Sequence, residues 1–118
     1  MIRFDDDVKI FICRDQVDMR KSIDGLTLLV IDSLQLNPQA KAIYLFHNKA
    51  KDKFKAIFWD GNGFMLLYKR LEKGRLKFPK NIESDYYEID PDLFSWLRKG
   101  YDFYAIKYEP ELKASQYF

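Results

Sequence analysis

Short apolar runs separated by turn-forming residues predict a fold built mainly from β-strands. Five of the six residues in Val8–Cys13 are apolar or cysteine, which predicts a first strand buried on both faces. Further strands are expected at Ala42–Phe46 and Lys53–Trp59, where apolar and aromatic residues again predominate. Residues 60–63 read Asp-Gly-Asn-Gly, a sequence typical of a hairpin turn. The strand expected at Phe64–Arg70 should therefore pair with the strand before it.

A helical pattern lies between the first two predicted strands. Its apolar face is formed by Ile23, Leu26, Val30, Ile31 and Leu34, which recur at the spacing of one side of an α-helix. Asp18 or Ser22 is the expected cap at the start of this helix. The helix should run to about Gln35, because the Asn37-Pro38 pair that follows disfavours helical backbone.

The last third of the chain is expected to add two short extended pieces and a second helix. Arg75–Phe78 and Tyr86–Ile89 are the predicted strands, and Asp90-Pro91 begins a helix that Gly100 ends. The predicted fold class is α+β, with an antiparallel β-meander of about four to five strands and two packed helices. Residues 1–118 should form a single domain with a loose tail from about residue 107.

The composition excludes several classes of protein. The chain has 118 residues, of which 47% are hydrophobic and 17% aromatic, so it can bury enough surface to fold. No apolar run approaches the roughly 20 residues that span a bilayer, and the start of the chain has no signal-peptide core. We therefore expect a cytoplasmic protein with no membrane partner. The chain has one cysteine, Cys13, which excludes an internal disulfide. It has one histidine, His47, so a zinc site or a histidine-based catalytic triad is hard to build.

Charge is distributed unevenly along the chain. Residues 41–82 hold eleven basic and three acidic side chains, a net charge of +8. The segment before them carries −2 and the segment after them −4. This pattern favours one basic surface that meets an anion, and a nucleic acid is the leading partner. An acidic protein is a second possibility, and a third is that the lysines only solubilise an aromatic-rich sheet.

Side chains alternate between the two faces of the predicted hairpin. A turn centred on Gly61-Asn62 would pair Trp59 with Phe64, whereas a turn centred on Asn62-Gly63 would pair Trp59 with Leu66. Both registers give the same two faces. The face expected in the core carries Phe54, Ala56, Phe58, Met65, Leu67 and Lys69. The other face carries Lys53, Lys55, Ile57, Trp59, Phe64, Leu66, Tyr68 and Arg70.

The second face combines cations with a tyrosine, which suits phosphate contacts and base stacking. The alternative is that a helix covers its apolar end while its cations reach water. Arg20 and Lys21 stand at the start of the first helix, where positive charge is unfavourable. That placement indicates either phosphate binding or an ion pair with Asp24. The candidate DNA-binding residues are Arg20, Lys21, Lys49, Lys51, Lys53, Lys55, Tyr68, Arg70, Lys73, Arg75 and Lys77.

Three segments of the chain together carry a family resemblance. They are residues 18–26 (DMRKSIDGL), 59–64 (WDGNGF) and 68–75 (YKRLEKGR). In this order and spacing they resemble the TnpB-type accessory protein (Orf2) of the insertion-sequence family numbered sixty-six, over about residues 8–103. The resemblance implies a bacterial mobile element, and an accessory role in transposition beside a separate transposase that carries the catalytic carboxylates.

The expected function is that of a non-enzymatic accessory factor that binds DNA, either at the ends of the insertion sequence or without sequence preference. The alternative is a protein adaptor that binds the transposase without contacting DNA. Asp15, Asp18, Asp60 and Glu83 could form a metal-binding set, because strand transfer needs carboxylates that converge on divalent ions. Asp18 and Asp60 have simpler roles as a helix cap and a turn residue. We expect no catalytic residue, no metal, no cofactor and no small-molecule substrate.

Overall fold

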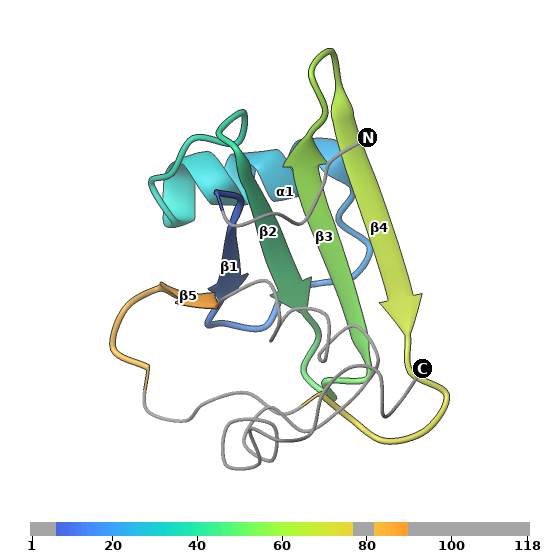
Figure 1. The fold of residues 1–118 in the computed structure, drawn as a ribbon. Helices are drawn as coiled ribbons and strands as arrows, with labels where there is room; N and C mark the ends of the chain where they lie inside the picture. The colour runs from blue at the N-terminus through green and yellow to red at the C-terminus, as the bar shows by residue number, and fades with distance from the viewer. Residues whose placement is uncertain (1–6, 77–81, 90–118) are drawn as a thin grey trace.

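A five-stranded mixed sheet forms the centre of the molecule, and one helical segment lies against one of its faces (Figure 1). This computed structural model describes residues 7–76 and 82–89. The strands follow each other across the sheet in the order β4-β3-β2-β1-β5. They are β1 (Lys9–Cys13), β2 (Ala42–His47), β3 (Lys53–Trp59), β4 (Phe64–Arg70) and β5 (Tyr86–Ile89).

The predicted antiparallel meander is right for β2, β3 and β4 and wrong for β1. β1 pairs with β2 in parallel, with Ile10 opposite Ile43. A parallel neighbour requires a crossover connection, and the helical segment between β1 and β2 supplies it. β5 then pairs antiparallel with the other edge of β1, with Ile10 opposite Ile89. β1 therefore lies inside the sheet. Ile10 and Ile12 join the core cluster on one face and Cys13 joins the cluster on the other, in agreement with the predicted burial on both faces.

The helical segment is shorter than expected and changes its winding. It begins as α1 (Ile23–Leu28) and continues as a π-helical stretch, η1 (Leu29–Ser33). Ser22 occupies the N-cap position without a side-chain hydrogen bond to the helix. The helix ends two residues before Gln35, which adopts a left-handed backbone with φ of 56°.

One member of the predicted apolar helix face points the wrong way. Leu26 and Val30 are fully buried against the sheet, whereas 48% of Ile31 is exposed. Val30 and Ile31 lie in the π-helical stretch η1, whose wider winding departs from the α-helical spacing on which the prediction rested. Once Val30 faces the sheet, Ile31 is turned toward the solvent.

Two predictions for the end of the chain have different outcomes. The strand expected at Arg75–Phe78 is wrong for its first two residues, which form no strand. The backbone N–H of Leu76 instead donates to the carbonyl oxygen of Lys51 (2.7 Å), so this segment is tied to the turn before β3. The second helix predicted from Asp90-Pro91, and the tail from about residue 107, lie outside the described residues.

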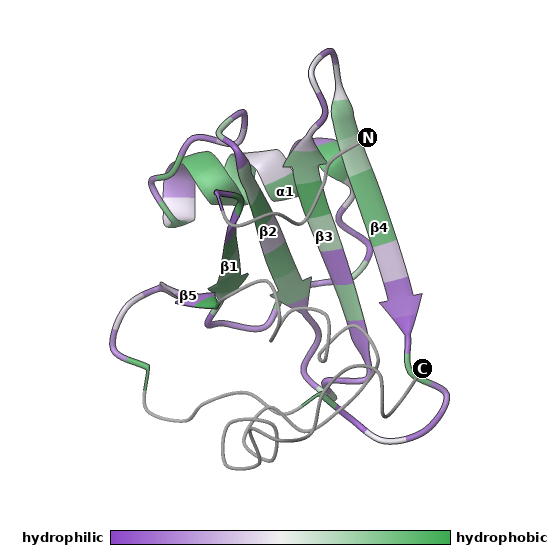
Figure 2. Ribbon diagram, in the orientation of Figure 1, coloured by the Kyte–Doolittle hydropathy of each residue, from purple (hydrophilic) through white to green (hydrophobic). Residues whose placement is uncertain are grey.

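Each face of the sheet has its own apolar core. On the helix side, Leu26, Val30 and Leu34 pack with Tyr44, Phe46 and Ile57. On the opposite side, residues of β1, β2 and β3 pack with Leu76. Figure 2 shows the hydrophobic middle of the sheet and the polar ends of β3 and β4, away from the hairpin turn.

The hairpin register is the first of the two predicted alternatives, because Trp59 lies opposite Phe64. The predicted faces are confirmed: Phe54, Ala56 and Phe58 join one core cluster, and Ile57 joins the other. The prediction that the β4 residues Met65 and Leu67 belong to the core is wrong, since 44% and 37% of their surfaces are exposed. β4 is the last strand on its side of the sheet, so its side chains have strand neighbours on one side only. Among the described residues, no helix is long and apolar enough to cross a membrane.

Candidate nucleic-acid interface

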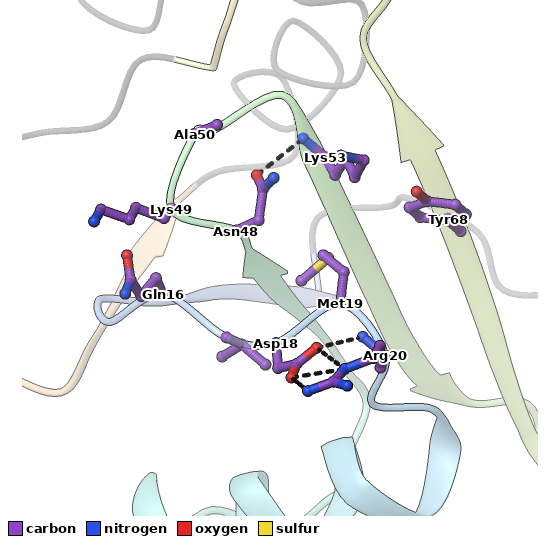
Figure 3. Close-up of a pocket in the computed structure, with 10 residues that line it drawn as sticks. Gln16, Asp18, Met19, Arg20, Asn48, Lys49, Ala50, Lys53 and Tyr68 are labelled. Atoms are coloured by element: carbon purple, nitrogen blue, oxygen red, sulfur yellow. Dashed lines mark hydrogen bonds and ion pairs between the residues drawn. The ribbon is translucent and has the colours of Figure 1, made fainter.

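An open hollow of about 700 Å³ lies beside the ends of β3 and β4 that are remote from the hairpin turn (Figure 3). Three parts of the chain meet there: the connection after β1, the turn between β2 and β3, and the paired strands β3 and β4. The lining residues are Gln16, Val17, Asp18, Met19, Arg20, Asn48, Lys49, Ala50, Lys53 and Tyr68. The fold thus places four predicted DNA-binding residues, Arg20, Lys49, Lys53 and Tyr68, around one concave surface.

His47 ties the connection after β1 to the end of β2. It is buried, and its ring nitrogens lie within hydrogen-bond distance of the carbonyl oxygens of Arg14 (Nε2, 3.2 Å) and Asn48 (Nδ1, 3.0 Å). The carbonyl oxygen of His47 in turn accepts a hydrogen bond from the backbone N–H of Val17 (2.8 Å). These contacts hold two walls of the hollow together. Its ring is buried against these carbonyl oxygens, so His47 joins the two segments.

Asn48 organises the turn that carries Lys49. Its Oδ1 accepts hydrogen bonds from the backbone N–H groups of Asp52 (3.2 Å) and Lys53 (3.1 Å). Its Nδ2 donates to the carboxylate of Asp52 (2.7 Å). Lys51 follows in a left-handed backbone conformation with φ of 60°. The turn therefore has a defined shape, with Lys49 exposed on it.

Asp18 holds Arg20 in place. The Asp18 carboxylate accepts hydrogen bonds from the guanidinium of Arg20, the shortest 2.7 Å, and one from the Arg20 backbone N–H (2.8 Å). Of the two expected caps, Asp18 is therefore wrong, because its carboxylate binds Arg20 and the N-cap position belongs to Ser22. Arg20 forms its ion pair with Asp18 and not with Asp24, the partner suggested above. The Arg20 side chain remains 92% exposed at the rim of the hollow.

The bond with Arg20 makes a testable prediction about acidity. The Arg20 guanidinium, followed by its backbone N–H, lowers the pKa of Asp18 from the ordinary 3.8 to about 2. Because the pKa is lowered in the folded state, this interaction stabilises the fold above about pH 4 and is lost as the pH falls toward 2. NMR titration of the Asp18 carboxyl carbon should give a midpoint near 2 in the wild type and a clearly higher one in Arg20→Ala.

Arg70→Ala is the matched control for this titration, because it removes the same kind of side chain from a different carboxylate. It should leave the Asp18 midpoint unchanged, since Arg70 pairs with Glu72 (2.8 Å). A wild-type midpoint near 3.8 would show that Asp18 and Arg20 are not paired in solution.

Lys55 lies next to the hollow and is already engaged. Its Nζ donates to the backbone carbonyl oxygen of Lys21 (2.7 Å) and lies 5.4 Å from the centre of the Tyr68 ring. Lys55 therefore links β3 to the start of the helix and supports one aromatic wall of the site. Lys53 has a longer ion pair with Asp52 (3.8 Å).

The remaining candidates do not line this hollow. Arg75 lines a second one of about 550 Å³, together with Asp52, Leu71, Glu72 and Gly74. Lys73 is exposed in the bend beside this second hollow. The carbonyl oxygen of Lys51 accepts a hydrogen bond from the backbone N–H of Leu76, which follows the same bend. Lys77 lies outside the described residues. Arg20, Lys49 and Lys53 thus line one hollow and Arg75 lines the other, and Asp52 lies beside both.

Sequence reasoning missed two residues that shape the main hollow. Met19 forms part of its apolar lining, and Asn48 shapes the turn behind Lys49. Met19 lies inside the first signature segment, so that segment was the available signal. No pattern marked Asn48. Among the described residues, no group of three or more histidine, cysteine or acidic side chains is placed to hold a metal ion.

Comparison with known proteins decides the family. The family model described as "IS66 Orf2 like protein" matches residues 8–108. The chain belongs to the IS66 Orf2-like family. This confirms the resemblance and links the protein to transposition of an insertion sequence.

Similar curated proteins add no biochemical activity to this IS66 Orf2-like protein. The uncharacterized protein y4jC of Sinorhizobium fredii is 33% identical over 103 residues, which is 87% of each chain. The uncharacterized protein y4hO of the same organism is 34% identical over 95 residues, covering 80% of this chain and 82% of its own. No solved structure matches significantly.

Proposed function

We propose that this IS66 Orf2-like protein is a non-enzymatic accessory factor that binds DNA during transposition, beside a separate transposase of the element. The observation that carries the proposal is the convergence of Arg20, Lys49, Lys53 and Tyr68 on one open hollow. These residues come from three separate parts of the chain. Their meeting on one surface supports a shared ligand, and an anionic ligand with planar rings matches their chemistry.

The ion pairs at the rim are compatible with phosphate binding. Arg20 is bonded to Asp18 and Lys53 to Asp52, so these acids orient two of the cations. Lys49 makes no ion pair within the described part of the chain and is exposed. Two of the three rim cations are lysines, which cannot form the bidentate hydrogen bonds that arginine makes to phosphates or guanines. We therefore expect contact with the DNA backbone and little sequence preference.

The proposal assigns no catalytic step to this chain. Asp15 bonds to Arg14 (3.0 Å), Asp18 to Arg20 and Asp52 to Asn48, so each of these carboxylates has a local structural partner. Magnesium-dependent nicking by the purified protein, abolished by Asp60→Asn, would contradict this part of the proposal.

A salt titration tests DNA binding directly. Fluorescence anisotropy with short duplexes, one from an end of the insertion sequence and one unrelated, should show binding at low salt to both. If three to five phosphates are contacted, the slope of log K against log salt concentration should be about −3 to −5. No binding to either duplex at low salt would overturn the proposal.

The adaptor alternative rests on a different observation. Met65 and Leu67 are exposed on β4, on the sheet face opposite the helix. Exposed apolar side chains on an outer strand suit a protein partner, here the transposase. Co-purification with the transposase, weakened by the double variant Met65→Lys and Leu67→Lys, together with no DNA binding, would favour the adaptor function.

A further inference from the structure

The main hollow is concave, which restricts the form of DNA that can fill it. In a duplex the bases are stacked inside and the phosphates form the outer surface. A duplex can place phosphates on the rim residues Arg20, Lys49 and Lys53, but it has no free base to enter the space between them. The hollow has a volume of about 700 Å³ and is open to the solvent, so an unpaired base can enter it.

The interior of the hollow differs chemically from its rim. Val17 contributes apolar surface from the connection after β1. Met19 adds to it from the same connection, and Tyr68 contributes an aromatic ring from β4 (Figure 3). Tyr68 is 54% exposed, so part of its ring is open to a ligand. An apolar and aromatic interior under a cationic rim is the arrangement that binds a stacked base with its phosphate in proteins that hold single strands.

Tyr68 is also held in position before any ligand arrives. The Lys55 ammonium lies over one face of its ring, 5.4 Å from the ring centre, and donates to the backbone carbonyl oxygen of Lys21 (2.7 Å), so a base would stack on the other face. Across the hollow, His47 and Asn48 keep the two loops in place through partly buried hydrogen bonds. A preorganised stacking surface loses little freedom on binding, which favours affinity.

We propose that this hollow takes up an unpaired nucleotide, so that the protein binds single-stranded or locally opened DNA more tightly than intact duplex. This inference rests on the proposed function and names the form of DNA that the same site prefers. The base packs against Tyr68 and Met19, and the adjoining phosphates contact Lys49, Lys53 and Arg20. Because every base has a flat face, the preference is for strandedness and not for sequence.

The test compares three probes of one sequence: a single strand, the duplex, and the duplex with an unpaired flap. Affinities are measured by anisotropy at one fixed salt concentration. The wild type should bind the single strand and the flap more tightly than the duplex. Tyr68→Ala should weaken single-strand binding by about 5- to 150-fold, with little change for the duplex or in the salt slope. Tyr68→Phe keeps the ring and should retain the preference.

Phe64→Ala is the matched control, because it removes an aromatic ring from the other end of the same strand. It should not change the preference. Each variant must melt within a few degrees of the wild type. If Tyr68→Ala does not fold, Met19→Glu serves instead, because it places a carboxylate in the hollow and should abolish the preference for unpaired DNA.

The outcomes separate this inference from the proposed function. Duplex binding with the expected salt slope but no preference for unpaired DNA would overturn the inference and leave the proposed function standing. A preference that neither Tyr68→Ala nor Met19→Glu changes would show that the hollow is not the site, and would also overturn the inference. No binding to any of the three probes would overturn both.

Discussion

Replacing Lys49 and Lys53 together by alanine should weaken duplex DNA binding about 60-fold at about 0.1 M salt. Each phosphate contact contributes about 0.9 to the slope of log K against log salt concentration. Two lost contacts therefore flatten the slope by nearly two units, which corresponds to this loss of affinity at that salt concentration. Both lysines line the same hollow, so we expect both to contact phosphates of the same bound DNA segment. Anisotropy titrations at several salt concentrations measure the two quantities together.

The matched control removes two lysines from the opposite end of the sheet. Lys9 and Lys41 are adjacent there, where the backbone N–H of Lys9 donates to the carbonyl oxygen of Lys41 (3.3 Å). The double variant Lys9→Ala and Lys41→Ala changes the net charge by the same amount. It should leave the slope within a fraction of a unit of the wild type. Equal losses in the two double variants would mean that overall charge, and not this hollow, governs binding.

Phe46→Ala should lower the free energy of unfolding by about 3–5 kcal/mol. Phe46 is fully buried in the helix-side core, on the central strand β2. Truncating it removes apolar contacts and leaves a cavity that the two neighbouring strands cannot close. Since domains of this size are stable by only about 5–15 kcal/mol, a large share of the stability is lost. Urea denaturation followed by circular dichroism measures the change.

Met65→Ala is the control for this stability measurement. Its side chain is 44% exposed on the outer strand, so much of it is in contact with water before truncation. The loss should be well below that of Phe46→Ala, at about 1 kcal/mol or less. Comparable losses for the two variants would contradict the arrangement of the strands described above.

Local signals in the sequence determined several parts of this protein. Residues 60–63 specify the hairpin through turn chemistry, with Gly61 at a φ of 77° that favours glycine, and the period of two assigned side chains to the correct faces of β3 and β4. The helical spacing located the segment that contains Leu26 and Val30. The signature segments identified the family. Each of these features depends on residues that are close along the chain, so a single sequence contains the information.

Only the tertiary structure decided how these pieces meet. The parallel pairing of β1 with β2, and the position of β5 beside β1, depend on contacts between residues far apart in the sequence. The outer position of β4 explains why Met65 and Leu67 are exposed although their alternation predicts burial.

The candidate site shows the same division. Arg20, Lys49, Lys53 and Tyr68 were chosen from the sequence for their charge or their ring, but nothing in the sequence separated them from Lys73 and Arg75. The fold brings the first four together and leaves Arg75 in another hollow. Met19 and Asn48 were missed because a methionine and an asparagine carry no charge that marks a site. Their roles arise from the hydrogen bonds and the packing of the connection after β1 against the turn before β3, which only the three-dimensional arrangement creates.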